Sequence, residues 1–134
     1  MTTITSTSPA TPVNPCPQNW TYFAPSSACF YSPLTDFNWT DAEEFCVNRS
    51  SHLVSIHSEE ELYFFINTFL WGWSGLHKTD GEWKWTDNTP TDYLYWQRGY
   101  PQENENSCVH LFGTFWNDHA CGDSLPTVCK MVIQ

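Results

Sequence analysis

The chain has 134 residues and a formal net charge of −10, with five Lys and Arg against fifteen Asp and Glu. This excess of negative charge repels phosphate-rich polymers and anionic lipid surfaces, so the composition argues against a nucleic-acid partner. The length suffices for one domain with a hydrophobic core. No run of about 18 apolar residues is present, so the sequence predicts no direct membrane insertion.

Six cysteines in a chain this short predict three disulfides. Disulfides persist in an oxidising compartment, so an extracellular protein is expected, either secreted or the ectodomain of a membrane protein. A structural zinc site is the weaker alternative, because no cysteine pair has the C-x₂₋₄-C spacing of such sites. Three N-glycosylation sequons agree with secretion, and they begin at Asn19, Asn38 and Asn48.

The N-terminal segment, residues 1–15, consists mainly of Thr, Ser, Pro and Ala. It cannot bury enough apolar surface to offset its ordering entropy, so a linker or an O-glycosylated stalk fragment is expected. A poorly packed tail is the plainer alternative. Polar residues follow Met1 in place of a signal peptide, which favours an excised domain with an added start Met. The folded domain is expected to span residues 16–134.

Two short strands are expected first, at Trp20–Phe23 and Cys29–Tyr31, around a turn that contains Pro25. The segment Thr40-Asp41-Ala42-Glu43 then fits a capping box, in which the Thr and Glu side chains bind the unpaired amides of a helix start. Apolar side chains recur at helical spacing from Ala42 onward. The sequence therefore predicts a first helix that begins at Thr40.

A second capping box, Ser58-Glu59-Glu60-Glu61, predicts the start of another helix. Its apolar face repeats at helical spacing through Leu62, Phe65, Ile66 and Phe69. Between the two helices, the short apolar segment 53–56 is expected to form a strand.

The pattern changes after Trp71, where aromatic residues are interspersed with Gly, Pro, Asp, Asn and Thr. Residues 77–106 are predicted to form a long loop region that contains one short strand, Trp83–Thr86. Such loops in compact domains are often functional. Closing strands are expected at Cys108–Phe112, Thr114–Trp116 and Thr127–Val132. Helices and short strands in this order indicate an α+β fold.

No catalytic constellation is visible. Six paired cysteines leave no thiol nucleophile, and no Ser lies in a Gly-x-Ser-x-Gly elbow. The five histidines lack metal-ligand spacing, although His119 could meet His77 or His110 in space. An enzyme is therefore not expected.

The segment Trp73-Ser74-Gly75-Leu76, the segment Ser55-Ile56-His57-Ser58 and the cysteine frame together resemble a C-type lectin domain. The first segment matches the family's Trp-Ile-Gly-Leu motif with Ser in place of Ile. The resemblance covers about residues 16–132. It implies a C-type lectin-like fold, with two helices, short antiparallel sheets and a long loop region. It also implies the pairs Cys16–Cys29, Cys46–Cys129 and Cys108–Cys121, whereas cysteine counting alone leaves many pairings open.

The resemblance also implies a calcium site. In sugar-binding relatives, a Glu-Pro-Asn or Gln-Pro-Asp triplet with a cis-proline, a Glu before the next Cys and a Trp-Asn-Asp motif supply oxygen ligands to Ca²⁺. The matching positions here are Gln102, Glu105, Asn106, Asn117 and Asp118, and Pro101 takes the place of the cis-proline. With Tyr100 added, these residues form the candidate ligand-binding site.

Several departures weaken that site. Tyr100 offers no carboxylate or amide oxygen, and Gln102 is one methylene longer than Asn. Glu105 lies three residues before Cys108, where relatives more often have the acid two residues before it. Without a contribution from Glu103 or Glu105, the site keeps one certain carboxylate, and calcium affinity falls with carboxylate count. A second family calcium site is not expected, because Lys78 precedes the nearest acids.

The sequence thus predicts an extracellular recognition module that binds a glycan or glycoprotein through the long-loop face, with a weak or absent calcium site. The alternative is a calcium-independent domain that binds a protein ligand through the same face. An ice-binding module has no support in the sequence. Asn117 and Asp118 could simply brace the loop. The loop aromatics could stack on sugar or serve as packing, and they are Tyr93, Tyr95, Trp96 and Tyr100.

Overall fold

The structure is a computed structural model that describes residues 14–102 and 106–133. It contains two helices within these ranges, α1 (Trp39–Val47) and α2 (Glu59–Thr68). Neither is long and apolar enough to cross a membrane. The predicted linker falls almost wholly on residues 1–13, which lie outside the described residues.

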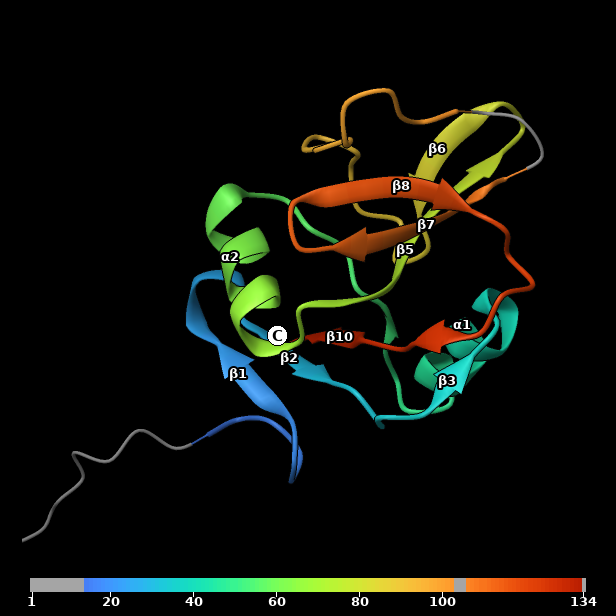
Figure 1. The fold of residues 1–134 in the computed structure, drawn as a ribbon. Coiled ribbons are helices and arrows are strands. Elements are labelled where there is room, and N and C mark those ends of the chain that lie inside the picture. Colours follow the sequence, from blue (N-terminus) through green and yellow to red (C-terminus); the bar gives the residue numbers. More distant parts are fainter. Residues whose placement is uncertain (1–13, 103–105, 134) are drawn as a thin grey trace, which may run out of the picture.

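The strands form three small antiparallel sheets (Figure 1). The first joins both ends of the domain, in the order β1 (Thr21–Phe23), β2 (Ala28–Tyr31), β10 (Cys129–Val132) and β4 (His52–Leu53). A short 3₁₀ turn, η2 (Ala24–Ser26), connects β1 to β2. The second is the pair β3 (Asp36–Phe37) and β9 (Leu125–Pro126). The third has the order β6 (Glu82–Trp85), β5 (Trp71–Thr79), β7 (Cys108–Phe112) and β8 (Phe115–His119).

Large aromatic side chains fill the core, as the composition predicts. Trp73, Trp85 and Trp116 are fully buried. The Trp73 indole donates a hydrogen bond to the Phe37 carbonyl at 2.9 Å, which satisfies its polar edge. This bond joins β3 to β5, and the Trp39 indole of α1 donates likewise to the Ser74 carbonyl of β5 at 2.9 Å.

The Trp-Ser-Gly-Leu motif lies within β5 and is buried throughout. The Ser74 hydroxyl donates to the Val109 carbonyl at 3.0 Å, so the polar residue that replaces Ile is satisfied in the core. A Cβ on Gly75 would lie 2.7 Å from the Thr86 hydroxyl and 2.8 Å from the Leu53 carbonyl oxygen. This close approach of three segments requires glycine at position 75.

The start of the first helix differs from the prediction. Asn38 is the N-cap, and its side-chain oxygen accepts from the Asp41 amide at 2.8 Å. The expected capping box at Thr40 is therefore wrong, because Asn38 offers an equally good cap two residues earlier. Glu43 instead accepts a hydrogen bond from the Leu53 amide at 3.0 Å and lies 2.6 Å from His52 Nδ1.

The second helix begins where expected, with Ser58 accepting from the Glu61 amide at 3.0 Å. The Glu61 carboxylate does not return to Ser58, as a capping box requires, but accepts from the His57 amide at 2.8 Å. In the third sheet, β5 is a nine-residue strand that the sequence did not predict, and its residues 77–79 were wrongly expected to belong to the long loop region. The strand expected at 114–116 runs on to His119 and includes the Asn-Asp pair.

The three disulfides are Cys16–Cys29, Cys46–Cys129 and Cys108–Cys121, so the pairing implied by the resemblance is confirmed. The Cys46–Cys129 bridge joins α1 to β10 across a separation of 83 residues. It restricts the unfolded chain more than the other two bridges, each of which spans 13 residues.

Candidate functional site

The long loop runs from residue 86 to residue 107 and joins β6 to β7 above the third sheet (Figure 1). Its first half is tied to the body of the domain at Asp87. One carboxylate oxygen of Asp87 accepts from the Ser55 hydroxyl at 2.6 Å, and the other accepts from the Thr89 amide at 3.0 Å. A second tie joins Asp92 to His57 Nδ1 at 2.8 Å.

These ties hold both carboxylates in the charged form. Burial on its own raises the pKa of Asp87, but the hydrogen bonds from Ser55 and Thr89 and the Lys130 charge outweigh it and hold the pKa below its ordinary value. The hydrogen bond from His57 likewise lowers the pKa of the exposed Asp92.

A buried ion pair lies beneath this part of the loop. Lys130 Nζ is 2.7 Å from Glu61 Oε2, and the two side chains are 4% and 1% exposed. The same ammonium group donates to the Ser55 carbonyl at 3.0 Å and to the Ser55 hydroxyl at 3.1 Å. Ser55 therefore connects the α2–β10 ion pair to Asp87 and the loop. Sequence analysis missed this network, because its members lie far apart in the chain.

The second half of the loop returns over β8. The Tyr100–Pro101 peptide is cis, as the resemblance implied. The Gln102 amide donates to Asp118 Oδ1 at 2.9 Å. Asn117 donates through its side-chain nitrogen to Gln97 Oε1 at 3.2 Å. The structure thus brings Gln102, Asn117 and Asp118 together, and it adds Gln97, which no motif indicated.

The remaining candidate residues are less closely tied to this cluster. Tyr100 is half-buried, and its amide donates to the Gln97 carbonyl at 2.9 Å. Asn106 is half-buried just before β7. Glu105 lies outside the described residues, as does Glu103. In this structure Asn117 and Asp118 brace the long loop through their hydrogen bonds with Gln97 and Gln102.

The loop aromatics divide into packing and exposed groups. Trp96 packs edge-on against Trp83, with ring centroids 5.1 Å apart, and Tyr93 contacts buried Trp116 in the same manner at 6.0 Å. Tyr95 stacks on Tyr93 with an interplanar angle of 2° and is 43% exposed. Tyr95 therefore presents one aromatic ring of the long loop to solvent.

A histidine pair lies on the same strand pair. The rings of His110 and His119 have centroids 5.5 Å apart, which agrees with the contact that the sequence allowed. His119 Nε2 is 2.9 Å from Asp123. Burial lowers the pKa of His110, and the neighbouring His119 lowers it further. The hydrogen bond with Asn117 raises this pKa but does not offset the lowering. Over residues 14–102 and 106–133, no group of three His, Cys, Asp or Glu is arranged to hold a metal ion.

The candidate residues that the structure describes do not fit a complete calcium cage. Calcium takes about six to eight oxygen ligands, with carboxylates most important for affinity. Of the candidate residues that the structure describes, Asp118 alone is an acid, it is 3% exposed, and Oδ1 already accepts from the Gln102 amide. Gln102 has an exposed side chain, and Tyr100 offers no carboxylate or amide oxygen.

Comparison with known proteins agrees with this architecture. The family model for the lectin C-type domain matches residues 35–131. The chain is 36% identical to C-type lectin domain family 4 member F of Mus musculus, over 84% of this chain and 23% of that protein. It is 36% identical to the type-2 ice-structuring protein of Brachyopsis segaliensis, over 85% of this chain and 71% of that protein.

Solved structures give the same result. A calcium-independent type II antifreeze protein superposes with a TM-score of 0.82 at 34% identity, over 87% of this chain and 94% of that chain. The cow CD23 carbohydrate-recognition domain, solved in the presence of a GlcNAc2Man3 oligosaccharide, superposes with a TM-score of 0.80 at 36% identity, over 91% of this chain and 99% of that chain. The chain belongs to the C-type lectin domain family. Members of this family are recognition modules and not enzymes.

Proposed function

We propose that the long-loop face binds carbohydrate with weak or no dependence on calcium. The observations that carry this proposal are the polar cluster of Gln97, Gln102, Asn117 and Asp118 and the exposed ring of Tyr95 on the same loop. Side-chain amides and carboxylates offer donors and acceptors to sugar hydroxyls. An exposed aromatic ring offers a surface for the apolar face of a sugar ring.

Two similar structures support the two parts of this proposal. The cow CD23 domain is a carbohydrate-recognition domain that was solved in the presence of an oligosaccharide, which supports a glycan ligand for this chain. The type II antifreeze protein is described as calcium-independent, so the fold also functions without the ion. In this chain the hydrogen bond from the Gln102 amide to Asp118 supplies a loop brace that uses protein groups alone.

The test is binding to mannose-, fucose-, galactose- and GlcNAc-coated beads, in calcium and in chelator. Retention on at least one sugar, with free sugar as competitor, is expected under both conditions. Tyr95→Ala removes the stacking ring and should weaken retention, whereas Tyr22→Ala removes an exposed tyrosine of β1 and should not. Equal retention of both variants would contradict the role of the long-loop face.

A protein ligand is the second candidate for this face. It is favoured by Leu94, an exposed apolar residue next to Tyr95 on the loop. Such a ligand would be retained without competition from free sugar, and Leu94→Ser would weaken its binding. Absence of retention on every sugar, together with such a ligand, would replace the carbohydrate proposal.

We further propose an extracellular location, because the three disulfides require an oxidising compartment. Asn19 and Asn48 are exposed and accessible to glycosylation. Asn38 caps α1 through its side-chain oxygen, and its nitrogen lies 3.3 Å from Asp41 Oδ2. Of the three proposed N-glycosylation sites, Asn38 is therefore expected to be the least modified.

A further inference from the structure

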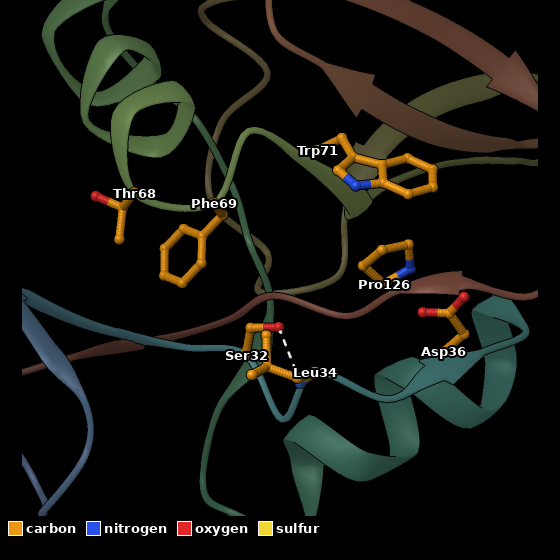
Figure 2. A pocket seen from close by; sticks show the side chains of 7 residues that line it. All are labelled: Ser32, Leu34, Asp36, Thr68, Phe69, Trp71 and Pro126. Atoms are coloured by element: carbon orange, nitrogen blue, oxygen red, sulfur yellow. Dashed lines mark hydrogen bonds between the residues drawn. The ribbon is translucent and has the colours of Figure 1, made fainter.

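A pocket of about 240 Å³ opens between the end of α2, the start of β5 and the β3–β9 pair (Figure 2). Apolar side chains form most of its wall, namely Leu34, Phe69, Trp71 and Pro126. The Asp36 carboxylate adds a negative charge, and Figure 2 shows it on the opposite side of Pro126 from the Trp71 indole. The pocket therefore combines an aromatic ring with a carboxylate.

None of the residues of the candidate carbohydrate site lines this pocket. Trp71 begins β5, whereas residues Leu76–Thr79 at the other end of β5 pair with β6. The long loop leaves β6 after Trp85, and the partner of Trp85 on β5 is Leu76, not Trp71. An occupant of the pocket does not need the long-loop face.

Two leucines at the rim have a backbone conformation that disfavours their residue type. Leu34 has φ of 61° and is 90% exposed, and Leu70 has φ of 71° and is 47% exposed. Left-handed backbone crowds the Cβ of any residue except glycine, and an exposed leucine recovers little of that energy by packing. Strained positions of this kind cluster at functional sites. Here both lie beside one pocket.

The apolar surface continues beyond the pocket. Phe112 and Phe115, on either side of the β7–β8 turn, are both exposed. The Phe112 ring lies 5.8 Å from the Trp71 ring, and the Gly113 amide donates to the Leu70 carbonyl at 2.8 Å. Leu70, Phe112 and Phe115 thus add exposed apolar surface beyond Trp71, of a kind that marks interaction surfaces.

Charge selects the occupant. Asp36 is exposed at the pocket, and the chain as a whole carries −10. None of the five cationic side chains of the chain lines the pocket, and these are Arg49, Lys78, Lys84, Arg98 and Lys130. The pocket therefore attracts a cation from outside the chain.

We propose that this pocket docks an arginine side chain of a protein partner. The planar guanidinium group stacks on aromatic faces such as that of Trp71 and donates paired hydrogen bonds to a carboxylate such as that of Asp36. Apolar residues beside the arginine then contact the leucine and phenylalanine rim. Polypeptide is the source that supplies both the cation and the flanking apolar groups.

The probe is the peptide acetyl-Leu-Arg-Leu-amide, titrated into the folded domain while the Trp71 indole N–H signal is followed by NMR. Trp71→Phe assigns that signal. A saturable shift is expected with this peptide. The same peptide with citrulline, which keeps the shape and removes the charge, should bind about tenfold more weakly. Free arginine amide should also bind more weakly, because it lacks the apolar flanks.

Three variants complete the test. Asp36→Asn should weaken peptide binding about fivefold, whereas Glu82→Gln, which removes an exposed charge on β6, should leave it unchanged. Leu34→Asn removes an apolar side chain from the rim, so it should weaken peptide binding. Asn adopts the left-handed backbone of this position more readily than Leu, so the melting temperature should stay equal or rise. The proposal is overturned by an unmoved Trp71 signal, by equal binding of the citrulline peptide or of arginine amide, or by full binding to Asp36→Asn.

Discussion

Replacing the buried Lys130 beneath the long loop is the most severe test of the polar network that it forms with Glu61 and Ser55. In the substitution Lys130→Met, the Glu61 carboxylate loses a partner at 2.7 Å and remains 1% exposed. Removing one member of a buried ion pair leaves an uncompensated buried charge and costs about 3–5 kcal/mol. The Glu61 oxygens would keep the Ser26 hydroxyl at 2.8 Å and the His57 amide at 2.8 Å, so a value near 3 kcal/mol is expected.

The assay is thermal and denaturant unfolding with the disulfides intact. For a chain of this length, a loss of about 3 kcal/mol lowers the melting temperature by about 10 °C. Lys84→Met removes an exposed lysine of β6 and should change stability by less than about 0.5 kcal/mol. Adding Glu61→Gln to Lys130→Met removes the unpaired charge and should recover part of the loss. A loss below about 1 kcal/mol in Lys130→Met would refute this reasoning.

Three further predictions concern the loop and the core. Asp118→Ala removes the acceptor of the Gln102 amide, so glycan binding should weaken by about 1–3 kcal/mol. Hydrogen exchange of the Gln102 amide should also accelerate. If glycan affinity and this exchange rate both stay unchanged, Asp118 does not brace the loop. The pKa of Asp87 is lower in the folded protein than in the unfolded chain. The stability that this difference contributes is present at pH values above the unfolded pKa and is lost as the pH falls through the folded pKa. Asp87→Asn should therefore flatten the acid side of the stability–pH curve below about pH 4. Gly75→Ala should cost about 1–3 kcal/mol through overpacking, measured by urea unfolding, whereas Gly122→Ala, with open space around it, should cost less than about 0.5 kcal/mol.

The sequence predicted those parts of the fold that depend on local patterns or on the cysteine frame. The helix through Leu62 and Phe65 was visible because apolar residues repeat at helical spacing. The cap at Asn38 was missed because two adequate caps stand close together, and tertiary contacts engage Glu43 elsewhere. β5 was missed because a strand buried along its centre does not alternate between polar and apolar residues.

The candidate site was predicted in part. The motif positions of Asn117, Asp118 and Gln102 do meet, because the loop returns over β8. Gln97 belongs to no motif and joins them only through the path of the loop. The buried pair of Lys130 and Glu61 could not be inferred, because charged residues are ordinarily exposed and their pairing depends on tertiary structure.

The most direct test of the proposed function is to titrate the best-retained sugar while amide signals of the long loop and β8 are followed by NMR, first in calcium and then in chelator. The account predicts saturable shifts near Tyr95, Gln102 and Asn117 under both conditions, with dissociation constants in the millimolar range that differ by less than about threefold. Binding that disappears in chelator would contradict the proposed weak dependence on calcium. Shifts confined to residues outside the long-loop face would contradict the site itself.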